Sequence, residues 1–468
     1  MKRRTKIVCT LGPAVATRER IADLIGAGMN VARINCSHGD WETRRKWVNW
    51  LRELSPNVGP VAILADLQGP KFRIGEFPNG SMELKPGQAL TIGQDPESDI
   101  AVPGDEIFEA MDPGSRLLLG DGDVEIKLGA MVGKRFSAKA ISGGLVKSRQ
   151  GVTLMGRSFQ TACLTEKDLE DVYEACRCGV DYIALSYVRK ASDLRELRRL
   201  VDKYDTSIKL CAKIETKEAI HELDEIMKVS DLIMVARGDL GLQMDIEDVP
   251  LAQKKIIARC AMAGKPVITA TQMLESMVHS PRPTRAESTD VANAILDGTD
   301  AVMLSGETAA GEYPIHAVKT MARIAEKAES LFDHRHRLEM LTGRHRTLDC
   351  TEAVALAANN LATSLRVKAV LTTTASGHTP RMVSKFRPKA PILCVAWDDR
   401  TYRQMAVVWG VDAIRLDTPG TTDEIVHNAI DAFMRFKRLK IGDQVVVTAG
   451  IPPGTPGHTN LILVQDVK

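Results

Sequence analysis

The segment Leu210-Cys-Ala-Lys213-Ile-Glu215 decides the fold, because its pattern recurs along the chain. An apolar run ends here in charged residues, and a helical stretch follows it. Apolar runs that alternate with amphipathic helical stretches are typical of parallel strands joined by helices. The segment therefore predicts one βα unit, whose apolar part is a buried strand.

Eight runs of this kind predict eight strands, and a helical segment follows each of them. The predicted strands are Lys6–Thr10, Val31–Ile34, Val61–Ala65, Tyr182–Leu185, Ile208–Ala212, Leu232–Val235, Pro266–Thr269 and Ala301–Leu304. The predicted helices include Trp41–Leu54, Ala191–Lys203 and Ser288–Leu296. Eight βα units are the number that closes a TIM barrel, so we expect an α/β protein built on a (β/α)8 barrel.

Two regions lie outside the barrel pattern. Between the third strand and its expected helix, Glu166–Cys178, a long stretch rich in Gly, Pro and alternating patterns predicts an inserted β-rich lid domain. After the eighth helix, His334–Arg346 is polar and basic, as expected of a linker, and a second αβ series follows with strands near Ala369–Thr373, Ile392–Val395, Ala413–Leu416, Gln444–Thr448 and Leu461–Val464. We expect a barrel over residues 1–70 and 158–335, a lid over residues 71–157 and a C-terminal α/β domain over residues 345–468.

The composition excludes several classes of protein. The chain has 468 residues, with 62 Lys and Arg against 60 Asp and Glu, so its formal net charge is only +2. This balance creates no field that would recruit nucleic acid or a membrane, and no stretch reaches membrane-spanning length. Nine scattered cysteines indicate neither a zinc site nor a disulfide framework, and His334, His336 and His345 have no acidic or cysteine partner nearby. We expect a reduced, cytoplasmic protein that binds neither nucleic acid nor membrane.

Polar residues collect at the carboxyl ends of the predicted strands, which is the catalytic face of a (β/α)8 barrel. One polar residue there means little, because strands commonly exit into polar loops. The residues at these ends are Arg33, Asn35, Ser37, Asp66, Ser186, Lys213, Glu215, Arg237, Asp239, Thr271, Ser305 and Glu307. Their recurrence on strand after strand predicts an active site at this end.

Lys213-Ile-Glu215 is the sharpest element of this group. Alternation along a strand puts Lys213 and Glu215 on the same face. Because the residues before Lys213 are apolar, we expect the pair inside the barrel mouth rather than on the surface. Arg237-Gly238-Asp239 adds a second carboxylate beside a glycine, which lets a ligand approach the backbone. Two carboxylates without converging His or Cys indicate Mg²⁺ (or Mn²⁺) rather than zinc.

Four cations, Arg33, Lys71, Arg73 and Lys213, are expected in the same neighbourhood. A divalent metal with several Arg and Lys side chains is suited to phosphate, and phosphoryl transfer depends mainly on such charge stabilisation. The chain has neither a G-x-x-x-x-G-K-[ST] loop nor a kinase-type Gly-rich loop. We therefore expect side chains and the metal to hold the phosphate.

Several segments of the chain closely resemble the motifs of the pyruvate kinase family. The segments span the whole barrel in the family's order, and the lid and the C-terminal domain fall in the expected places. The segments are KIVCTLGP (6–13), GMNVARINCSHG (28–39), DLQGPK (66–71), KIE (213–215), MVARGDLG (234–241), ATQMLESM (270–277), PRPTRAE (281–287) and MLSGET (303–308). The resemblance implies an enzyme that transfers the phosphoryl group of phosphoenolpyruvate to ADP, giving pyruvate and ATP in the last step of glycolysis.

The resemblance also implies roles for single residues. Lys213 would stabilise the phosphoryl group in flight, and Glu215 with Asp239 would bind Mg²⁺. Gly238 and Thr271 would hold the carboxylate of phosphoenolpyruvate, with Thr271 near the proton relay to the enolate carbon. Arg33 and Arg73 would contact phosphates, and Asn35, His38 and Arg73 would contact the nucleotide. The monovalent-cation position would consist of Asn35, Ser37, Asp66 and Leu67. Asp121 and Glu166–Asp168 would lie where lid and barrel meet the substrates.

The chain departs from the family pattern at two places. The lid segment QGVTLMG (150–156) lacks a nucleotide-facing lysine, for which Lys147 or Arg149 would have to substitute, so the lid contacts to ATP and the nucleotide preference stay open. Lys71 stands where K⁺-dependent members carry a Glu. Its ammonium is a fixed unit cation that would replace K⁺ and repel it. We expect K⁺ not to be required, unless Lys71 turns outward and only solvates the lid hinge.

The C-terminal domain carries a candidate effector site in TASGHTP (374–380), where a strand turns into a helix. Thr379 is the expected N-cap and Pro380 the expected first helical residue. Hydroxyls and free N–H groups there would bind phosphate, or would only cap the helix. The resemblance implies activation by a phosphorylated small molecule at Thr374, Ser376, Gly377 and Thr379, and a homotetramer.

Two other hypotheses are more remote. A metal-dependent barrel that acts on pyruvate by cleaving a carbon–carbon bond would share the two carboxylates, but it would not need so many cations or a lid. A barrel retained as a binding scaffold would be expected to lose Lys213, Glu215 or Asp239, and all three are present.

Overall fold

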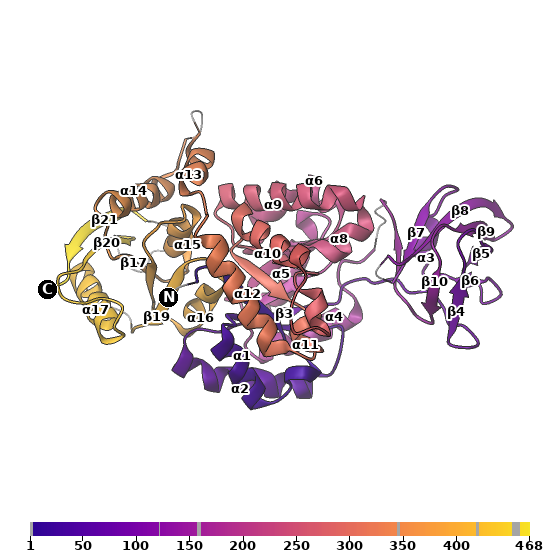
Figure 1. Ribbon diagram of the computed structural model, residues 1–468, viewed down its shortest axis with the longest axis horizontal. Helices are drawn as coiled ribbons and strands as arrows, with labels where there is room; N and C mark the ends of the chain where they lie inside the picture. The colour runs from indigo at the N-terminus through magenta and orange to yellow at the C-terminus, as the bar shows by residue number, and fades with distance from the viewer. Residues whose placement is uncertain (1–2, 121, 157–160, 344–346, 418–420, 452–458) are drawn as a thin grey trace.

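The computed structural model describes the chain except for residues 1–2, 121, 157–160, 344–346, 418–420 and 452–458. Three units lie in a row, with a barrel in the middle, a β-rich lid at one end and an α/β domain at the other (Figure 1). The N-terminus lies where the barrel meets the α/β domain, and the C-terminus lies at the far side of that domain.

Eight parallel strands close the barrel in the order β1-β16-β15-β14-β13-β12-β3-β2. They are β1 (Lys6–Thr10), β2 (Val31–Asn35), β3 (Ala62–Asp66), β12 (Tyr182–Leu185), β13 (Lys209–Ile214), β14 (Leu232–Ala236), β15 (Val267–Ala270) and β16 (Ala301–Leu304). No predicted boundary is wrong by more than two residues. Most of these strands are buried along their whole length, as expected of a parallel sheet covered on both faces.

Helices surround the barrel, and several begin at side-chain caps. Thr165 and Thr284 each form a capping box, in which the hydroxyl accepts the N–H of the third helical residue. The helices are α1 (Arg18–Ala27), α2 (Trp41–Val58), α4 (Glu166–Arg177), α5 (Ala191–Val201), α6 (Lys217–His221), α7 (Leu223–Val229), α8 (Arg237–Gln243), α9 (Val249–Ala263), α10 (Arg285–Asp297), α11 (Gly306–Ala309) and α12 (Pro314–Glu329). In the described residues, no helix has the length and the apolar character that a membrane crossing requires.

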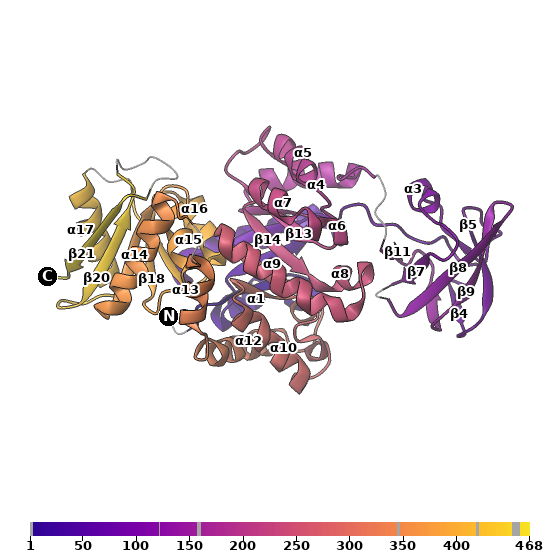
Figure 2. The ribbon, with the colours of Figure 1, turned by 90° about the horizontal axis from the view of Figure 1, so that it is seen from above.

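The lid stands apart from the barrel and has a hydrophobic core of its own (Figure 2). Its elements are β4 (Ser81–Leu84), β5 (Ala89–Gly93), β6 (Ile100–Ala101), α3 (Asp105–Glu109), β7 (Arg116–Leu119), β8 (Val124–Val132), β9 (Arg135–Ala140), β10 (Gly144–Lys147) and β11 (Val152–Leu154). They form one sheet in the order β11-β7-β8-β9-β5-β6 and a second sheet of β10 and β4. The insertion predicted after the third barrel strand is therefore confirmed as a β-rich unit.

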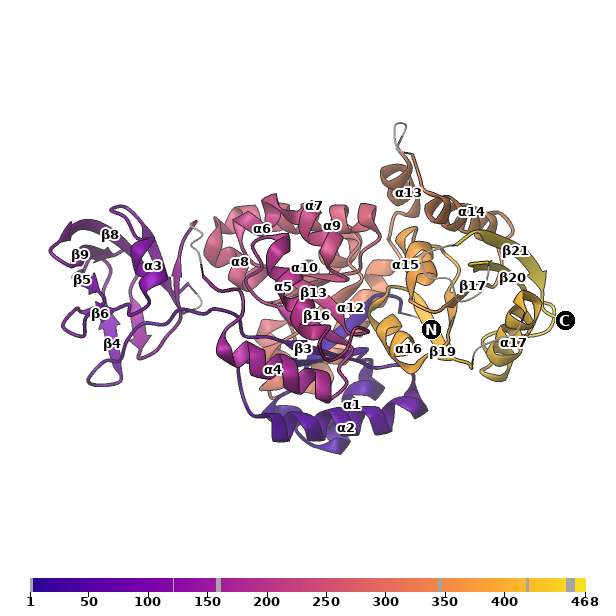
Figure 3. The ribbon, with the colours of Figure 1, turned by 180° about the vertical axis from the view of Figure 1, so that it is seen from behind.

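The C-terminal domain shares its core with the barrel. One buried cluster runs from inner barrel residues such as Val8 and Leu64 to Val370 and Phe386 of this domain. Its five-stranded sheet has the order β19-β18-β17-β20-β21, and only β21 is antiparallel. The elements are α13 (His334–Thr342), α14 (Cys350–Ser364), β17 (Ala369–Thr374), α15 (His378–Lys385), β18 (Ile392–Ala396), α16 (Asp399–Gln404), β19 (Val411–Arg415), α17 (Thr422–Arg435), β20 (Gln444–Ala449) and β21 (Leu461–Asp466). Figure 3 shows α16 and β19 against the barrel.

The prediction of a linker after the eighth helix was wrong, because most of that segment is helix α13. Asp333 caps the helix by accepting the N–H groups of Arg335 and His336. Leu341 is buried, and His334 bonds the Arg387 carbonyl through Nδ1 at 2.7 Å, so the helix packs on the C-terminal domain. His345 lies outside the described residues.

Candidate active site

Lys213, at the end of β13, lies at the centre of the predicted site. Its ammonium lies 2.8 Å from Glu215 Oε1 and 3.3 Å from Asp66 Oδ1, and it donates a hydrogen bond of 2.7 Å to Ser186 Oγ. Both Lys213 and Glu215 are buried, which confirms that they share the inward face of the strand end. A surface ion pair is therefore excluded.

The charges around Lys213 fix its ionisation. Burial alone would lower the pKa of Lys213, but the carboxylates of Asp66 and Glu215 outweigh it and raise the pKa well above its ordinary value. Burial likewise favours a neutral Asp66, yet the cations of Lys213 and Arg33 hold the pKa of that carboxyl below its usual range. Arg33 reaches Asp66 Oδ2 at 2.7 Å through Nε. The site therefore holds fixed positive charge near neutral pH.

Glu215 is a buried carboxylate with a different partner at each oxygen. Its Oε2 accepts the Tyr187 N–H at 2.6 Å, whereas Oε1 faces the Lys213 ammonium at 2.8 Å. Burial raises the pKa of Glu215 to about 7, Lys213 opposes that rise, and the Asp239 carboxylate adds to it. Two neighbouring carboxylates, one of them buried and crowded by the charge of the other, fit an oxygen-binding divalent cation such as Mg²⁺.

No richer metal cluster competes with this pair. Among the described residues, no three His, Cys, Asp or Glu side chains are grouped so that they could hold a metal ion. A cation at Glu215 and Asp239 would have to complete its coordination with water and substrate oxygens, which is how Mg²⁺ is usually bound.

Thr271 and Gly238 meet across the ends of β15 and β14. The Gly238 N–H donates to Thr271 Oγ1 at 2.7 Å, and that hydroxyl donates to the Ala270 carbonyl at 2.6 Å. Thr271 and Gln272 both have positive φ, 68° and 52°, which is rare for residues with a side chain. Arg237 stabilises this loop, because its guanidinium donates to the Thr271 carbonyl at 2.7 Å. Strained backbone of this kind is concentrated at functional sites.

The four residues of the predicted monovalent-cation position come from two adjacent strands. Asn35 and Asp66 are register partners at the ends of β2 and β3. The Asn35 side chain accepts the Ser37 N–H at 3.1 Å, and the Leu67 carbonyl accepts the Ser186 hydroxyl at 2.7 Å. Asp66 Oδ1 lies 3.3 Å from the Lys213 ammonium. The strand pairing thus brings these residues together, while His38 lies exposed on the loop after β2.

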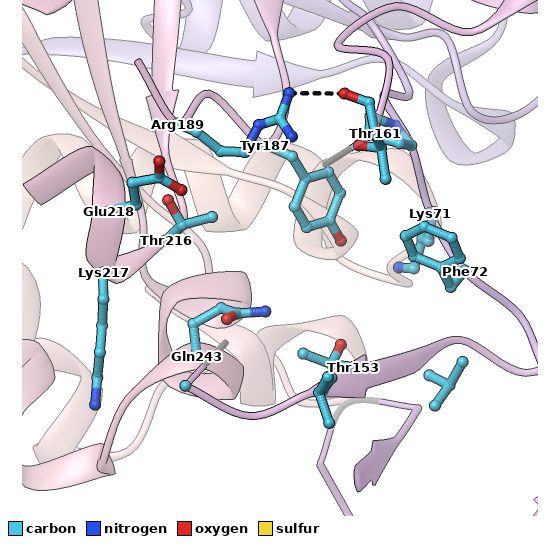
Figure 4. A pocket seen from close by; sticks show the side chains of 14 residues that line it. Lys71, Phe72, Thr153, Thr161, Tyr187, Arg189, Thr216, Lys217, Glu218 and Gln243 are labelled. Atoms are coloured by element: carbon cyan, nitrogen blue, oxygen red, sulfur yellow. Dashed lines mark hydrogen bonds between the residues drawn. The ribbon is translucent and has the colours of Figure 1, made fainter. Parts of the chain in front are cut away.

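Lys71 and Arg73 lie at the lid hinge. Lys71 lines a cavity between lid and barrel, together with Phe72 and Tyr187 (Figure 4). Its side chain passes Gly151 so closely that a Cβ there would lie 3.1 Å from Lys71 Cε. Arg73 pairs with the same lid segment and donates to the Arg149 carbonyl at 2.9 Å. Both cations are exposed at this position of the lid.

Arg149, one of the two lid residues proposed to replace the missing lysine, has another partner. The Arg149 guanidinium lies 2.5 Å from Glu76 at the exposed hinge. Gln150 turns back to accept the Lys147 N–H at 2.8 Å. Asp168, expected near the substrates, caps helix α4 and accepts the Gly69 N–H at 3.2 Å. Asp121 lies outside the described residues.

The expected N-cap in the C-terminal domain was wrong. Helix α15 begins at His378, so Gly377, with φ 78°, is its N-cap and Thr379 lies inside the first turn. The buried Thr379 hydroxyl bonds the Thr459 hydroxyl at 2.8 Å. Thr374 Oγ1 accepts the N–H groups of Ser376 and Gly377 at 3.3 and 2.8 Å, which closes the turn.

Two further residues shape the site and were not among the predicted ones. Arg44, buried on α2, donates to the carbonyls of Cys36 and His38 at 3.1 and 2.7 Å and so holds the loop after β2. Tyr187 contacts both Glu215 and Asp239. The sequence signal for Tyr187 is its position directly after the strand-end Ser186. Arg44 gives no such signal, because an Arg on a surface helix is ordinarily exposed.

Comparison with known proteins agrees with the geometry. The family model "Pyruvate kinase, barrel domain" matches residues 2–318, and "Pyruvate kinase, alpha/beta domain" matches residues 352–465. The chain is 46% identical over 477 residues to pyruvate kinase of Geobacillus stearothermophilus, covering 100% of this chain and 81% of that protein. It is 43% identical over 471 residues to the enzyme of Sporosarcina psychrophila, covering 99% and 80%. With both domains matched and the strand-end carboxylates and cations gathered at one mouth of the barrel, the chain belongs to the pyruvate kinase family of phosphotransferases.

Proposed function

We propose that this enzyme transfers the phosphoryl group of phosphoenolpyruvate to ADP, giving pyruvate and ATP, at the barrel end where Lys213, Glu215 and Asp239 meet. Membership of the family supports the reaction. The observation that carries the location is the buried Lys213 ammonium between the carboxylates of Asp66 and Glu215, with the charge of Asp239 nearby.

Lys213 is the proposed electrostatic catalyst. Its two carboxylate neighbours keep it charged, so it faces the transferring group without first having to gain a proton. Phosphoryl transfer needs little covalent chemistry and much stabilisation of developing charge. Arg33 and Arg73 are proposed to contact the phosphates, and Asn35, His38 and Arg73 the nucleotide.

Mg²⁺, or Mn²⁺ in its place, is proposed to bind between Glu215 and Asp239. The fit is the buried Glu215 carboxylate beside the second carboxylate of Asp239. When bound, such an ion would neutralise charge on the phosphate oxygens. The side chains of Glu215 and Asp239 would hold the ion.

Gly238 and Thr271 are proposed to bind the substrate carboxylate. The Gly238 N–H now donates to the Thr271 hydroxyl, and the two groups together offer two donors to an incoming carboxylate. Thr271 is also proposed to take part in the proton relay to the enolate carbon. Arg237 would keep the Thr271 backbone in place while the substrate binds and the proton is transferred.

Potassium independence is proposed from Lys71. In this lid position the Lys71 side chain lies beside Gly151 and lines the lid cavity, from which closure of the lid would carry it toward the barrel. A unit cation about 4 Å from a second one costs roughly 4 kcal/mol at an effective dielectric near 20, so Lys71 would exclude K⁺ from the position at Asn35, Ser37, Asp66 and Leu67.

Regulation and assembly are proposed from the resemblance. A phosphorylated effector would bind at Thr374, Ser376, Gly377 and Thr379 and activate the enzyme through the C-terminal domain. The turn closed by Thr374 and the core shared with the barrel support this proposal. Because α15 packs in that shared core, a shift of α15 would also shift side chains in the barrel interior. The enzyme is further proposed to be a cytoplasmic homotetramer.

One experiment tests these proposals together. Pyruvate formation is measured from phosphoenolpyruvate and ADP with Mg²⁺, in sodium, potassium and tetramethylammonium buffers, with and without a panel of sugar phosphates and AMP. We expect equal rates in the three buffers, no rate without a divalent cation, and a left-shifted substrate curve with one effector. Absence of pyruvate in every condition would overturn the reaction, a strong K⁺ requirement would overturn the role of Lys71, and unchanged curves would overturn the effector site.

A further inference from the structure

Tyr187 follows the end of β12 directly and occupies an unusual backbone conformation. Its φ is 53°, in the left-handed region that residues with a side chain rarely adopt. Ser186 before it bonds both Lys213 and the Leu67 carbonyl, so the chain is fixed immediately before this turn. A strained residue held by its neighbours in this way is a candidate for a functional role.

The conformation lets one residue reach both proposed metal ligands. The backbone N–H of Tyr187 donates to Glu215 Oε2 at 2.6 Å, and its phenol O–H donates to Asp239 Oδ1 at 3.5 Å. The first contact is short and the second is at the outer limit of a hydrogen bond. With Oε2 held by Tyr187 and Oε1 facing the Lys213 ammonium at 2.8 Å, the orientation of the Glu215 carboxylate is fixed.

The ring of Tyr187 forms one wall of the lid cavity. Phe72, Thr153 and Gln243 surround the same space, and the Tyr187 hydroxyl points into it (Figure 4). The apolar part of this wall would be served as well by phenylalanine. The hydroxyl gives tyrosine one contact that phenylalanine lacks, which is the Asp239 carboxylate.

We propose that Tyr187 is a positioning residue, which orients Glu215 through its N–H and Asp239 through its hydroxyl so that both carboxylates face one divalent cation. This inference rests on the proposed function, because it assumes that these two carboxylates bind the metal. Hydrogen-bond partners of metal ligands commonly change metal affinity or activity by about 10–100-fold. Because the phenol contact is long, its loss should weaken metal binding by a factor at the lower end of that range.

The test uses Mn²⁺ alone as the probe, with the full-length enzyme and no substrate, and measures free Mn²⁺ by electron paramagnetic resonance. Tyr187→Phe removes only the hydroxyl. Tyr182→Phe is the matched control, because it removes a phenol that bonds the Gln404 carbonyl at 2.9 Å from the opposite end of the same strand. Tyr187→Gly is a second variant, since glycine accepts positive φ, retains the N–H and removes the ring.

We expect Mn²⁺ to bind about tenfold more weakly to Tyr187→Phe and Tyr187→Gly than to the wild type, and equally well to Tyr182→Phe. Half-saturation of the reaction by Mg²⁺ should shift by the same factor, while turnover at saturating Mg²⁺ changes less. Wild-type Mn²⁺ affinity in Tyr187→Phe would overturn the inference. Glu215→Gln distinguishes failure of the role of Tyr187 from failure of the proposed metal site. If Glu215→Gln also binds Mn²⁺ like the wild type, the proposed metal site itself is wrong.

Discussion

The two ends of the barrel both bury charged side chains, but they use them differently. At the amino end, the fully buried Asp181 accepts the Ile63 N–H at 2.8 Å and the guanidinium groups of Arg52 and Arg403 at 2.9 and 2.8 Å. At the carboxyl end, Asp66 and Glu215 share one buried cation, the Lys213 ammonium, at 3.3 and 2.8 Å, and the charge of Asp239 raises the pKa of Glu215 further. Buried charge by itself therefore does not mark the active site, whereas a buried carboxylate that is crowded by a second one and shifted in pKa does.

The attachments of the outer domains follow the same division. The C-terminal domain is packed on the amino end through one continuous hydrophobic cluster, and Arg403 joins it to Asp181. The lid at the carboxyl end keeps a separate core. A cavity lies at each end, one lined by Lys71 and Tyr187 beside the lid and one lined by Lys6 and Arg403 beside the C-terminal domain. The two ends therefore differ in how the outer domain is attached, and a cavity is present at both.

The largest effect is expected from Lys213→Met. Removing the ammonium takes away stabilisation of charge that develops on the phosphoryl group, so turnover should fall about 100–1,000-fold. Folding should persist, because Arg33 still pairs with Asp66 and Glu215, whose pKa is already raised, gains a proton. Steady-state kinetics and thermal unfolding measure the two quantities. Lys213→Arg keeps a cation and should lose less, and more than a tenth of wild-type turnover in Lys213→Met would contradict the assigned role.

The stabilities of Asp181→Asn and Glu215→Gln are expected to differ, which tests the comparison of the two ends. The first change leaves two guanidinium groups without their shared carboxylate and should lower the free energy of unfolding by about 3–5 kcal/mol. The second removes one of the two carboxylates beside Lys213, but Asp66 remains and the crowding with Asp239 is relieved, so it should cost less stability than the first. Urea unfolding of both variants measures the difference. Equal destabilisation would show that the two ends do not differ in the way described.

A smaller, pH-dependent effect is expected from Lys6 at the amino end. Burial lowers the pKa of Lys6 to about 8, and its ammonium donates to the Val411 carbonyl at 2.7 Å. Above about pH 8 the unfolded chain binds more protons here than the folded chain, so stability rises with pH; below pH 8 the penalty for burying the charge is fully present. Between pH 7 and 9 the wild type should gain about 1 kcal/mol relative to Lys6→Met. Identical pH profiles of the two proteins in urea titrations would refute this.

Sequence patterns predicted the barrel well because its strands are buried along their whole length and end in polar residues. The contact between Lys213 and Glu215 followed from strand alternation alone. Helix α13 was missed because polar and basic residues dominate its composition, and only the structure shows that Leu341 is buried. The cap of α15 was assigned two residues late because Gly377 gave no side-chain signal. Tyr187 was missed because its role depends on a positive φ that a tyrosine does not predict.

The most direct test of the difference between the two ends is the activity of Glu215→Gln and Asp181→Asn per folded molecule. Pyruvate formation from phosphoenolpyruvate and ADP is measured with saturating Mg²⁺, at a temperature where unfolding curves show both variants to be folded. We predict that Glu215→Gln loses about 100-fold or more, whereas Asp181→Asn keeps nearly full turnover. Full activity in Glu215→Gln, or a comparable loss in folded Asp181→Asn, would contradict the assignment of the active site to the crowded carboxylates at the carboxyl end of the barrel.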